Sequence, residues 1–336
     1  GRKEQNNFKA TCVLTEHTPS RIDMPVLALV GPTAIGKTEL SIGLAREFNC
    51  EIVSVDSMQV YRYMDVGTAK ASVHERRMVP HHLIDIIDPD DDYNAARFVN
   101  DCLDAISAIH RNGATPLLTG GTGLYFQALR HGLFPAPRIE KPMRESLRRR
   151  IAEEGSAALH DELKEHDSNS AERIHPHDTT RILRALEIFQ ATGIPLTEHL
   201  RRQQENAAVR RFKHFIAIGL TCRRETLYQR INRRTTLLFE QGLENEVRRL
   251  LELVYGPELK SMQSIGYRHM VNYIEGRWSL DECVNALARD TRRYAKRQYT
   301  WFNRDESIEW FDRGDANEIF SYVEQKFSDC NSPSGN

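Results

Sequence analysis

Residues 27–41 read LALVGPTAIGKTELS, an apolar run that leads directly into GPTAIGKT at 31–38. The second part matches the phosphate-binding pattern G-x-x-x-x-G-K-[ST], with a strand pattern before it and a helix pattern after it. Its glycines let backbone N–H groups turn toward phosphate oxygens, Lys37 supplies a positive charge and Thr38 can hold Mg²⁺. Loops of this kind usually bind ATP or GTP, so the stretch predicts a phosphate site and leaves open which phosphate it holds.

The segments around this loop alternate between strand-like and helix-like patterns. The run VLALV before the loop is continuously apolar, as in a strand buried on both faces. Four more short apolar segments are expected to be strands: EIVSVDS (51–57), TPLLTGG (115–121), HFIAIGL (214–220) and SIEWF (307–311). Helical patterns lie between them, and this alternation is typical of an α/β protein. The sequence therefore predicts a P-loop NTPase-like fold with a doubly wound parallel sheet.

A change of pattern near Pro135 indicates a helical insertion. From Pro142 to about Arg211, helical segments follow one another and the strand patterns of the core do not recur. The predicted organisation is a disordered extension (1–24), a discontinuous P-loop core domain (25–138 and 212–325), a helical insertion domain (139–211) and a disordered tail (326–336).

Composition narrows the class of protein. The 336 residues are 40% hydrophobic and 28% charged, which is ordinary for a soluble globular chain. No apolar run approaches the roughly 18 residues of a membrane span, and the polar first residues do not resemble a secretory signal. The six cysteines form no C-x-x-C pair and are expected to be free thiols. The sequence thus predicts a cytoplasmic protein without membrane contact.

The net charge of −1 conceals an uneven distribution. Between Arg201 and Arg304 there are 21 Lys and Arg residues against 11 Asp and Glu residues. Such a basic segment suits a polyanionic partner, although solvated helix faces have the same composition. Within it, DTRRYAKRQYTWF (290–302) interleaves cations with aromatic rings, which is typical of RNA-binding surfaces and equally of an amphipathic helix packed on a core.

Acidic residues are sparse where a nucleotide-hydrolysing enzyme would need one. Such enzymes usually place an aspartate for Mg²⁺ at the end of a core strand, but TPLLTGGTG (115–123) offers only backbone and hydroxyl groups there. Asp56, at the end of the second expected strand, would lie in the ligand crevice of an open α/β sheet. Its carboxylate either accepts a proton or orients a nucleophile, or it caps the next helix, and the spacing favours neither.

Two further groups of residues invite a functional interpretation. Arg230 and Arg234 are four residues apart and share one helix face, so one of them could clamp a diphosphate. His81 and His82 have no third ligand nearby in the sequence, which favours a structural or hydrogen-bonding role over a metal site.

Seven stretches between about residues 26 and 312 together resemble the tRNA dimethylallyltransferase family, also called tRNA isopentenyltransferases. They are GPTAIGKT, IVSVDSMQVYRYMDVGTAK, VPHHLIDIIDP, PLLTGGTGLYFQAL, ERIHPHDTTRILRALEIFQATG, SIGYRHM and YAKRQYTWF. The resemblance implies transfer of a dimethylallyl group from dimethylallyl diphosphate to N6 of the adenine 3′ of the anticodon, tRNA position 37, with Mg²⁺ as cofactor. The phosphate loop would then hold a prenyl diphosphate, which agrees with the missing acid.

The resemblance also implies roles for particular residues. The catalytic residues would be Asp56, Arg234 and Lys37. The diphosphate would be bound by Gly31, Pro32, Thr33, Ala34, Ile35, Gly36, Lys37 and Thr38, and Thr38 would also bind the metal. The tRNA would contact Asp56, Ser57, Met58, Gln59, Thr122, Arg144, Thr180, Arg181, Ile182, Leu183, Arg184, Gln263, Ser264, Ile265, Gly266, Tyr267 and Arg268.

Some features depart from the family pattern, and other functions remain open. Ile35, Tyr63 and Ala71 stand where the family usually has different residues. The alternatives are an adenylate isopentenyltransferase, a P-loop small-molecule kinase and a non-enzymatic RNA-binding module. The helical insertion and the basic segment favour tRNA as the acceptor, and the expected partners are the tRNA anticodon stem-loop and dimethylallyl diphosphate, bound by a monomer.

Overall fold

The core of the molecule is a six-stranded, fully parallel sheet with the order β3-β2-β4-β1-β5-β6. The computed structural model describes residues 21–133, 139–206 and 211–331. The strands are β1 (Val26–Val30), β2 (Cys50–Val55), β3 (His81–His82), β4 (Thr115–Gly120), β5 (Phe215–Thr221) and β6 (Ile308–Asp312). The predicted doubly wound α/β fold is confirmed, and β3 is a short edge strand that the sequence pattern did not reveal.

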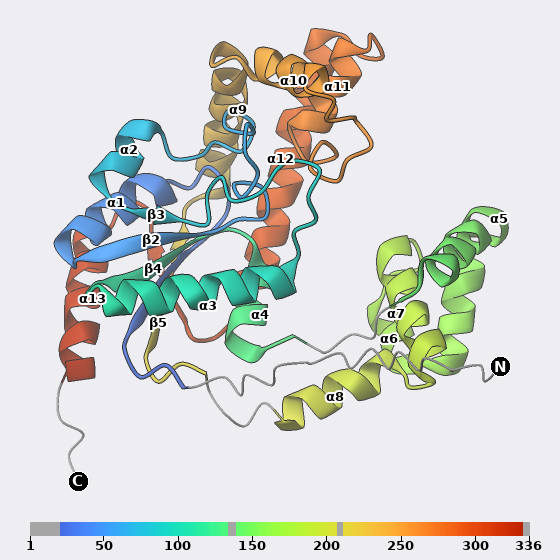
Figure 1. The fold of residues 1–336 in the computed structure, drawn as a ribbon, viewed down its shortest axis with the longest axis horizontal. Helices are drawn as coiled ribbons and strands as arrows, with labels where there is room; N and C mark the ends of the chain where they lie inside the picture. The colour runs from blue at the N-terminus through green and yellow to red at the C-terminus, as the bar shows by residue number, and fades with distance from the viewer. Residues whose placement is uncertain (1–20, 134–138, 207–210, 332–336) are drawn as a thin grey trace, which may run out of the picture.

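Helices cover both faces of this sheet (Figure 1). Because successive strand residues point to opposite faces, Ala28 of β1 packs in one layer and Leu27 and Leu29 pack in the other. The first layer contains α3 (Ala95–Arg111) and α4 (Gly123–His131). The second layer contains α1 (Lys37–Glu47) and α13 (Ala316–Asn331). This three-layer packing explains why β1 is apolar throughout.

The carboxyl ends of the central strands lie level with one another. Val30 of β1 and Val55 of β2 are both in register with Gly120 of β4. The segments that follow these three strands therefore emerge at one edge of the sheet. The helices above and around this edge are α2 (Val73–Met78), α9 (Arg224–Glu240), α10 (Leu243–Glu252), α11 (Tyr267–Ile274) and α12 (Leu280–Phe302) (Figure 1).

The insertion is helical and lies apart from the sheet (Figure 1). Its helices are α5 (Lys141–His166), α6 (Ser168–Arg173), α7 (Thr179–Thr192) and α8 (Leu196–Asn206). Leu147, Leu159 and Leu163 of α5 pack with Ile182 and Leu186 of α7 in a hydrophobic cluster of their own. These helices therefore bury their apolar faces against one another rather than against the sheet.

Two expectations about the chain ends were wrong for the residues that the structure describes. Helix α13 continues to Asn331, so 326–331 are helical rather than a disordered tail, because Ile319 and Val323 pack on the sheet and start an amphipathic helix. At the other end, Ile22 forms a parallel bridge with Phe212, so the predicted extension is ordered there. The remainder of both segments lies outside the described residues. In the described ranges, no helix is long and apolar enough to cross a membrane.

Candidate active site

A cleft of about 1010 Å³ opens at the carboxyl edge of the sheet. It is bounded by the loop after β1, the segment after β2, the end of β4, helices α9 and α12, and the residues before α11. Fifteen residues that the sequence singled out line it: Thr33, Ala34, Gly36, Lys37, Thr38, Asp56, Ser57, Met58, Gln59, Arg230, Arg234, Gln263, Ser264, Ile265 and Arg268. The fold thus brings residues from four separate parts of the chain into one concave site.

The phosphate loop has the backbone geometry that its glycines permit. Gly36 has a φ of 111°, a left-handed conformation that favours glycine, and α1 begins directly after it. The Lys37 ammonium donates to the carbonyls of Gly31 and Pro32, each at 2.8 Å. Burial, reinforced by the charge of Arg234, lowers the pKa of Lys37 to about 7, and the charge of Asp56 opposes this shift. A cation is therefore held at the loop, ready to turn toward an anion.

Arginines surround the loop. Arg234 of α9 donates from Nη1 to Thr33 Oγ1 at 3.3 Å, and burial lowers its pKa, against the charge of Asp56. Arg230, one turn earlier, donates to the Ala34 carbonyl at 2.7 Å. The predicted shared face of these two arginines is thus directed at the loop. The structure adds Arg313, which donates to the Ile35 carbonyl at 3.0 Å and carried no motif in the sequence.

Asp56 has the capping role that the sequence left open, at the turn after β2. Its Oδ1 accepts the backbone N–H groups of Met58 at 2.8 Å and Gln59 at 3.2 Å, so it caps the turn after β2. Within the described part of the chain, no hydrogen bond reaches its Oδ2. Because its negative charge opposes the downward pKa shifts of Lys37 and Arg234, the carboxylate lies within electrostatic range of the phosphate loop. The turn thus fixes a carboxylate that can still accept a hydrogen bond from a ligand.

Two residues of α12 complete the site, and sequence reasoning missed their roles. Gln298 is buried, accepts the Thr33 N–H at 2.8 Å and donates to the Gly121 carbonyl at 3.0 Å. A Cβ atom at Gly121 would lie 2.0 Å from the Gln298 amide nitrogen, so a larger residue there would displace this amide from its hydrogen bonds. Burial raises the pKa of the nearby Tyr294, and the negative charge of Asp56 adds to this shift. Both residues belong to the cation-rich aromatic stretch 290–302, whose spacing did not reveal them.

Other residues named from the sequence lie behind the lining. Ile35 and Tyr267 are fully buried, so they support the cleft rather than form its surface. Thr122 accepts the Ser57 N–H at 3.3 Å and precedes α4. Gly31, Pro32 and Gly266 are likewise absent from the lining residues. Of the three departures from the family pattern, Ile35 and Ala71 are buried in the core, and Tyr63 is exposed with a φ of 66° outside the cleft.

The insertion residues are not part of the cleft. Arg144 of α5 and Arg184 of α7 both donate to the buried carboxylate of Glu187, at 3.2 and 3.1 Å. Arg181 pairs with Asp178 at 3.4 Å. Three more insertion residues were named from the sequence. Thr180 is exposed, Leu183 is partly buried and Ile182 is fully buried. A partner that touches these residues must extend well beyond the cleft.

The paired histidines have structural partners. His81 Nδ1 lies 2.8 Å from the Val79 carbonyl, and His82 Nε2 lies 2.6 Å from a carboxylate oxygen of Glu51. The contact with Glu51 joins the edge strand β3 to β2, and the one with Val79 holds the residues just before β3, in line with the role favoured from the sequence.

Comparisons with known proteins identify the family of the chain. A family model described as IPP transferase matches residues 59–305, and one described as isopentenyl transferase matches 24–86. The tRNA dimethylallyltransferase of Desulfotalea psychrophila is 51% identical over 310 residues, which cover 92% of this chain and 98% of the relative.

Solved structures give the same result. The tRNA isopentenylpyrophosphate transferase of Bacillus halodurans is 39% identical, with a TM-score of 0.67 and coverage of 91% of this chain and 97% of that one. A eukaryotic dimethylallyltransferase acting on tRNA is 27% identical, with a TM-score of 0.75 and coverage of 94% and 82%. The chain therefore belongs to the IPP transferase family.

Proposed function

We propose that this protein transfers a dimethylallyl group from dimethylallyl diphosphate to N6 of the adenine 3′ of the anticodon, tRNA position 37, and releases diphosphate. The observation that carries the proposal is that one cleft joins a cation-lined phosphate loop to the Asp56 carboxylate. An anionic leaving group and a nucleophilic amine can therefore be held in the same space. The names of the curated relatives and of the solved neighbours support tRNA as the acceptor.

The phosphate end of the cleft stabilises the leaving group. As the bond between the allylic carbon and the diphosphate oxygen breaks, its electron pair moves onto the diphosphate. Lys37, Arg234 and the N–H groups at the start of α1 are placed to neutralise that charge. Such fixed donors act most strongly in a site that excludes water, and Arg234 is held by its bond to Thr33.

Asp56 acts on the acceptor. The N6 lone pair forms the new bond to the allylic carbon while the carbon–oxygen bond breaks, and the nitrogen then loses a proton. A hydrogen bond from the amine to Asp56 orients the lone pair and gives the proton an acceptor. Because Oδ1 is held by the turn at Met58 and Gln59, Oδ2 is the oxygen that we assign to this contact.

The cleft also fits a magnesium ion held together with the substrate. Mg²⁺ usually binds one or two protein oxygens, several waters and the phosphates of a substrate. Thr38 offers such an oxygen, and the buried hydroxyl of Thr119 in the cleft has no hydrogen-bond partner among the described residues. Bound there, Mg²⁺ would neutralise diphosphate charge.

The tRNA must reach this cleft with one base out of its stack, as for other enzymes that modify a base. We assign this contact to the cleft residues of 56–59 and 263–268 and to Arg297 of α12. The insertion, with Arg144 and Arg184, is placed to hold the anticodon stem beyond the cleft (Figure 1). We propose that the protein acts as a cytoplasmic monomer, where tRNA is available.

Radiolabelled dimethylallyl diphosphate distinguishes the candidate functions. Incubated with unmodified tRNA and Mg²⁺, the protein is expected to label the tRNA and to release diphosphate. Labelling of AMP instead would indicate an adenylate isopentenyltransferase. Rapid ATP hydrolysis without prenyl transfer would overturn the proposal in favour of a kinase.

A further inference from the structure

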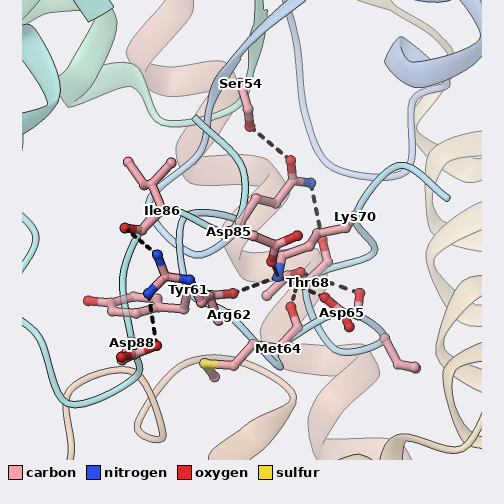
Figure 2. A network of polar contacts seen from close by, with 12 residues as sticks. Ser54, Tyr61, Arg62, Met64, Asp65, Thr68, Lys70, Asp85, Ile86 and Asp88 are labelled. Atoms are coloured by element: carbon pink, nitrogen blue, oxygen red, sulfur yellow. Dashed lines mark hydrogen bonds and ion pairs between the residues drawn. The ribbon is translucent and has the colours of Figure 1, made fainter. Parts of the chain in front are cut away.

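One wall of the cleft, residues 56–70, contains turns but no helix or strand. It is anchored from within by Lys70, whose side chain is only 2% exposed (Figure 2). The Lys70 ammonium donates to the Tyr61 carbonyl at 2.5 Å, to Asp65 at 2.8 Å and to Asp85 at 2.5 Å. A buried cation with three oxygen partners holds the middle of this wall in one conformation.

The same wall is attached to the sheet through Gln59. Its side chain accepts the Ser54 hydroxyl at 2.8 Å and donates to the Thr68 carbonyl at 3.3 Å. The start and the end of the segment are therefore tied to each other, and the turn at Gly67–Ala69 is presented to the cleft.

Glu246 of α10 holds this turn from outside the cleft. Its carboxylate accepts three consecutive backbone N–H groups, those of Asp65 at 2.8 Å, Val66 at 2.7 Å and Gly67 at 3.0 Å. The fourth donor is the hydroxyl of Tyr267, at 2.6 Å. One carboxylate thus joins the wall after β2 to the first residue of α11, which is separated from it by about 200 positions in the chain.

The two segments are also in direct contact. A Cβ atom at Gly67 would lie 2.5 Å from the Tyr267 ring, and one at Gly266 would lie 3.7 Å from the Gly67 carbonyl oxygen. The residues that precede Tyr267, namely Gln263, Ser264 and Ile265, line the cleft as well. A change in how Glu246 binds the turn must therefore change the spacing of both walls.

We propose that Glu246, acting with Tyr267, is a positioning residue that sets the width of the cleft at its tRNA end. The inference rests on the proposed function, because these walls are the ones assigned to the acceptor base and its neighbours. Glu246 and Tyr267 do not line the cleft themselves, and the phosphate loop is anchored separately by Arg230, Gln298 and Arg313. Their effect is therefore confined to the tRNA side.

The test compares Glu246→Gln and Tyr267→Phe with Glu244→Gln. The control removes the same charge from the same helix, at a residue that pairs with Arg248 at 2.8 Å and is remote from the turn. For Glu246→Gln, kcat/KM for an anticodon stem-loop is expected to fall by about 10- to 100-fold, the scale of a misplacement of about 1 Å. Tyr267→Phe removes one donor and keeps the ring, so a smaller loss in the same direction is expected. The dissociation constant for inorganic pyrophosphate should stay within about twofold for every variant.

Two results would overturn the inference. In the first, Glu246→Gln and Tyr267→Phe have the same kcat/KM for the stem-loop as Glu244→Gln. In the second, Glu246→Gln or Tyr267→Phe weakens pyrophosphate binding as much as stem-loop binding. If Glu246→Gln does not fold, Tyr267→Phe and its stem-loop affinity decide the question. Binding of a fluorescent stem-loop, measured by anisotropy, also separates this inference from the proposed function. A wild-type protein that binds the stem-loop but transfers no prenyl group would contradict the function alone.

Discussion

At the scale of single residues, Asp56 caps a turn of the fold and, in the proposed function, also acts on the substrate. The turn after β2 needs an acceptor for two N–H groups, and Oδ1 provides it. That bond fixes the direction of the whole carboxylate, so Oδ2 is oriented without further support. A carboxylate that is held by its own backbone loses little entropy when it meets a substrate, and this is the form of preorganisation that catalysis requires.

Replacement of Asp56 by asparagine separates these two roles. Asp56→Asn keeps an oxygen for the turn but removes the charge, so the protein should fold with an unchanged melting temperature to within a few degrees. If the carboxylate activates the amine, kcat should fall by on the order of 10² or more, and KM for dimethylallyl diphosphate should change little. Steady-state kinetics with tRNA measures both. A folded variant with the wild-type kcat would show that Asp56 serves only the turn.

Lys37 is expected to make diphosphate binding depend on pH. Because the pKa of Lys37 is lowered to about 7, the amine is mostly neutral at pH 8 in the free protein. A bound diphosphate favours the charged form and raises that pKa, so binding at pH 8 takes up a proton and affinity falls as pH rises above 7. Calorimetry with inorganic pyrophosphate in two buffers of different ionisation enthalpy measures the uptake. The same proton uptake in Lys37→Met would show that Lys37 is not the group that takes up the proton.

At the scale of elements, apolar patterning predicted the principal strands and failed where burial is partial. Strands β1, β2, β4, β5 and β6 were expected because each is a short apolar run bounded by turn residues. The two-residue β3 and helix α13 were not expected. In α13, Ile319 and Val323 are the fully buried residues, and this single pair four positions apart is too short a helical signal to stand out from the polar residues on either side of it. Short and half-exposed elements depend on neighbours that a local pattern does not contain.

The insertion helices allow a direct test of stem recognition. Arg144 is about half exposed and is held by the buried Glu187. Arg144→Ala should weaken binding of the anticodon stem-loop by about tenfold, the scale of one hydrogen bond between charged groups. Pyrophosphate binding should be unchanged, because the cleft lies elsewhere. The matched control is Arg149→Ala, an exposed arginine on the same helix. Equal losses in the two variants would indicate a general charge effect rather than a specific contact.

At the scale of the whole molecule, the site is made by long-range contacts that spacing alone does not encode. The phosphate loop and Asp56 could be predicted because each follows directly from a strand end. Gln298 and Glu246 could not, since their partners lie 265 and about 180 positions away. The roles of these residues depend on where α10 and α12 pack, and that packing is set by the entire core. Local motifs therefore identify the reacting groups, and the tertiary fold determines which residues hold them.

The distribution of charge leads to a prediction for the molecule as a whole. The basic segment 201–304 contributes α9 and α12, and Arg230, Arg234 and Arg297 from these helices line the cleft, so the excess charge converges on the site.

A tRNA that binds there releases counterions from its phosphates, and the logarithm of the association constant should fall linearly with the logarithm of salt concentration. With about five phosphates neutralised, the slope should be near −4. Arg297→Ala should reduce the slope by about one, because Arg297 is exposed at the cleft, where its guanidinium lies over the Tyr294 ring at 5.7 Å, and can reach a phosphate. Anisotropy titrations at salt concentrations from about 50 to about 300 mM, which span the range of electrostatic screening, measure this slope. A flat plot would show that tRNA is held by uncharged contacts, and the basic segment would then be a solvated surface.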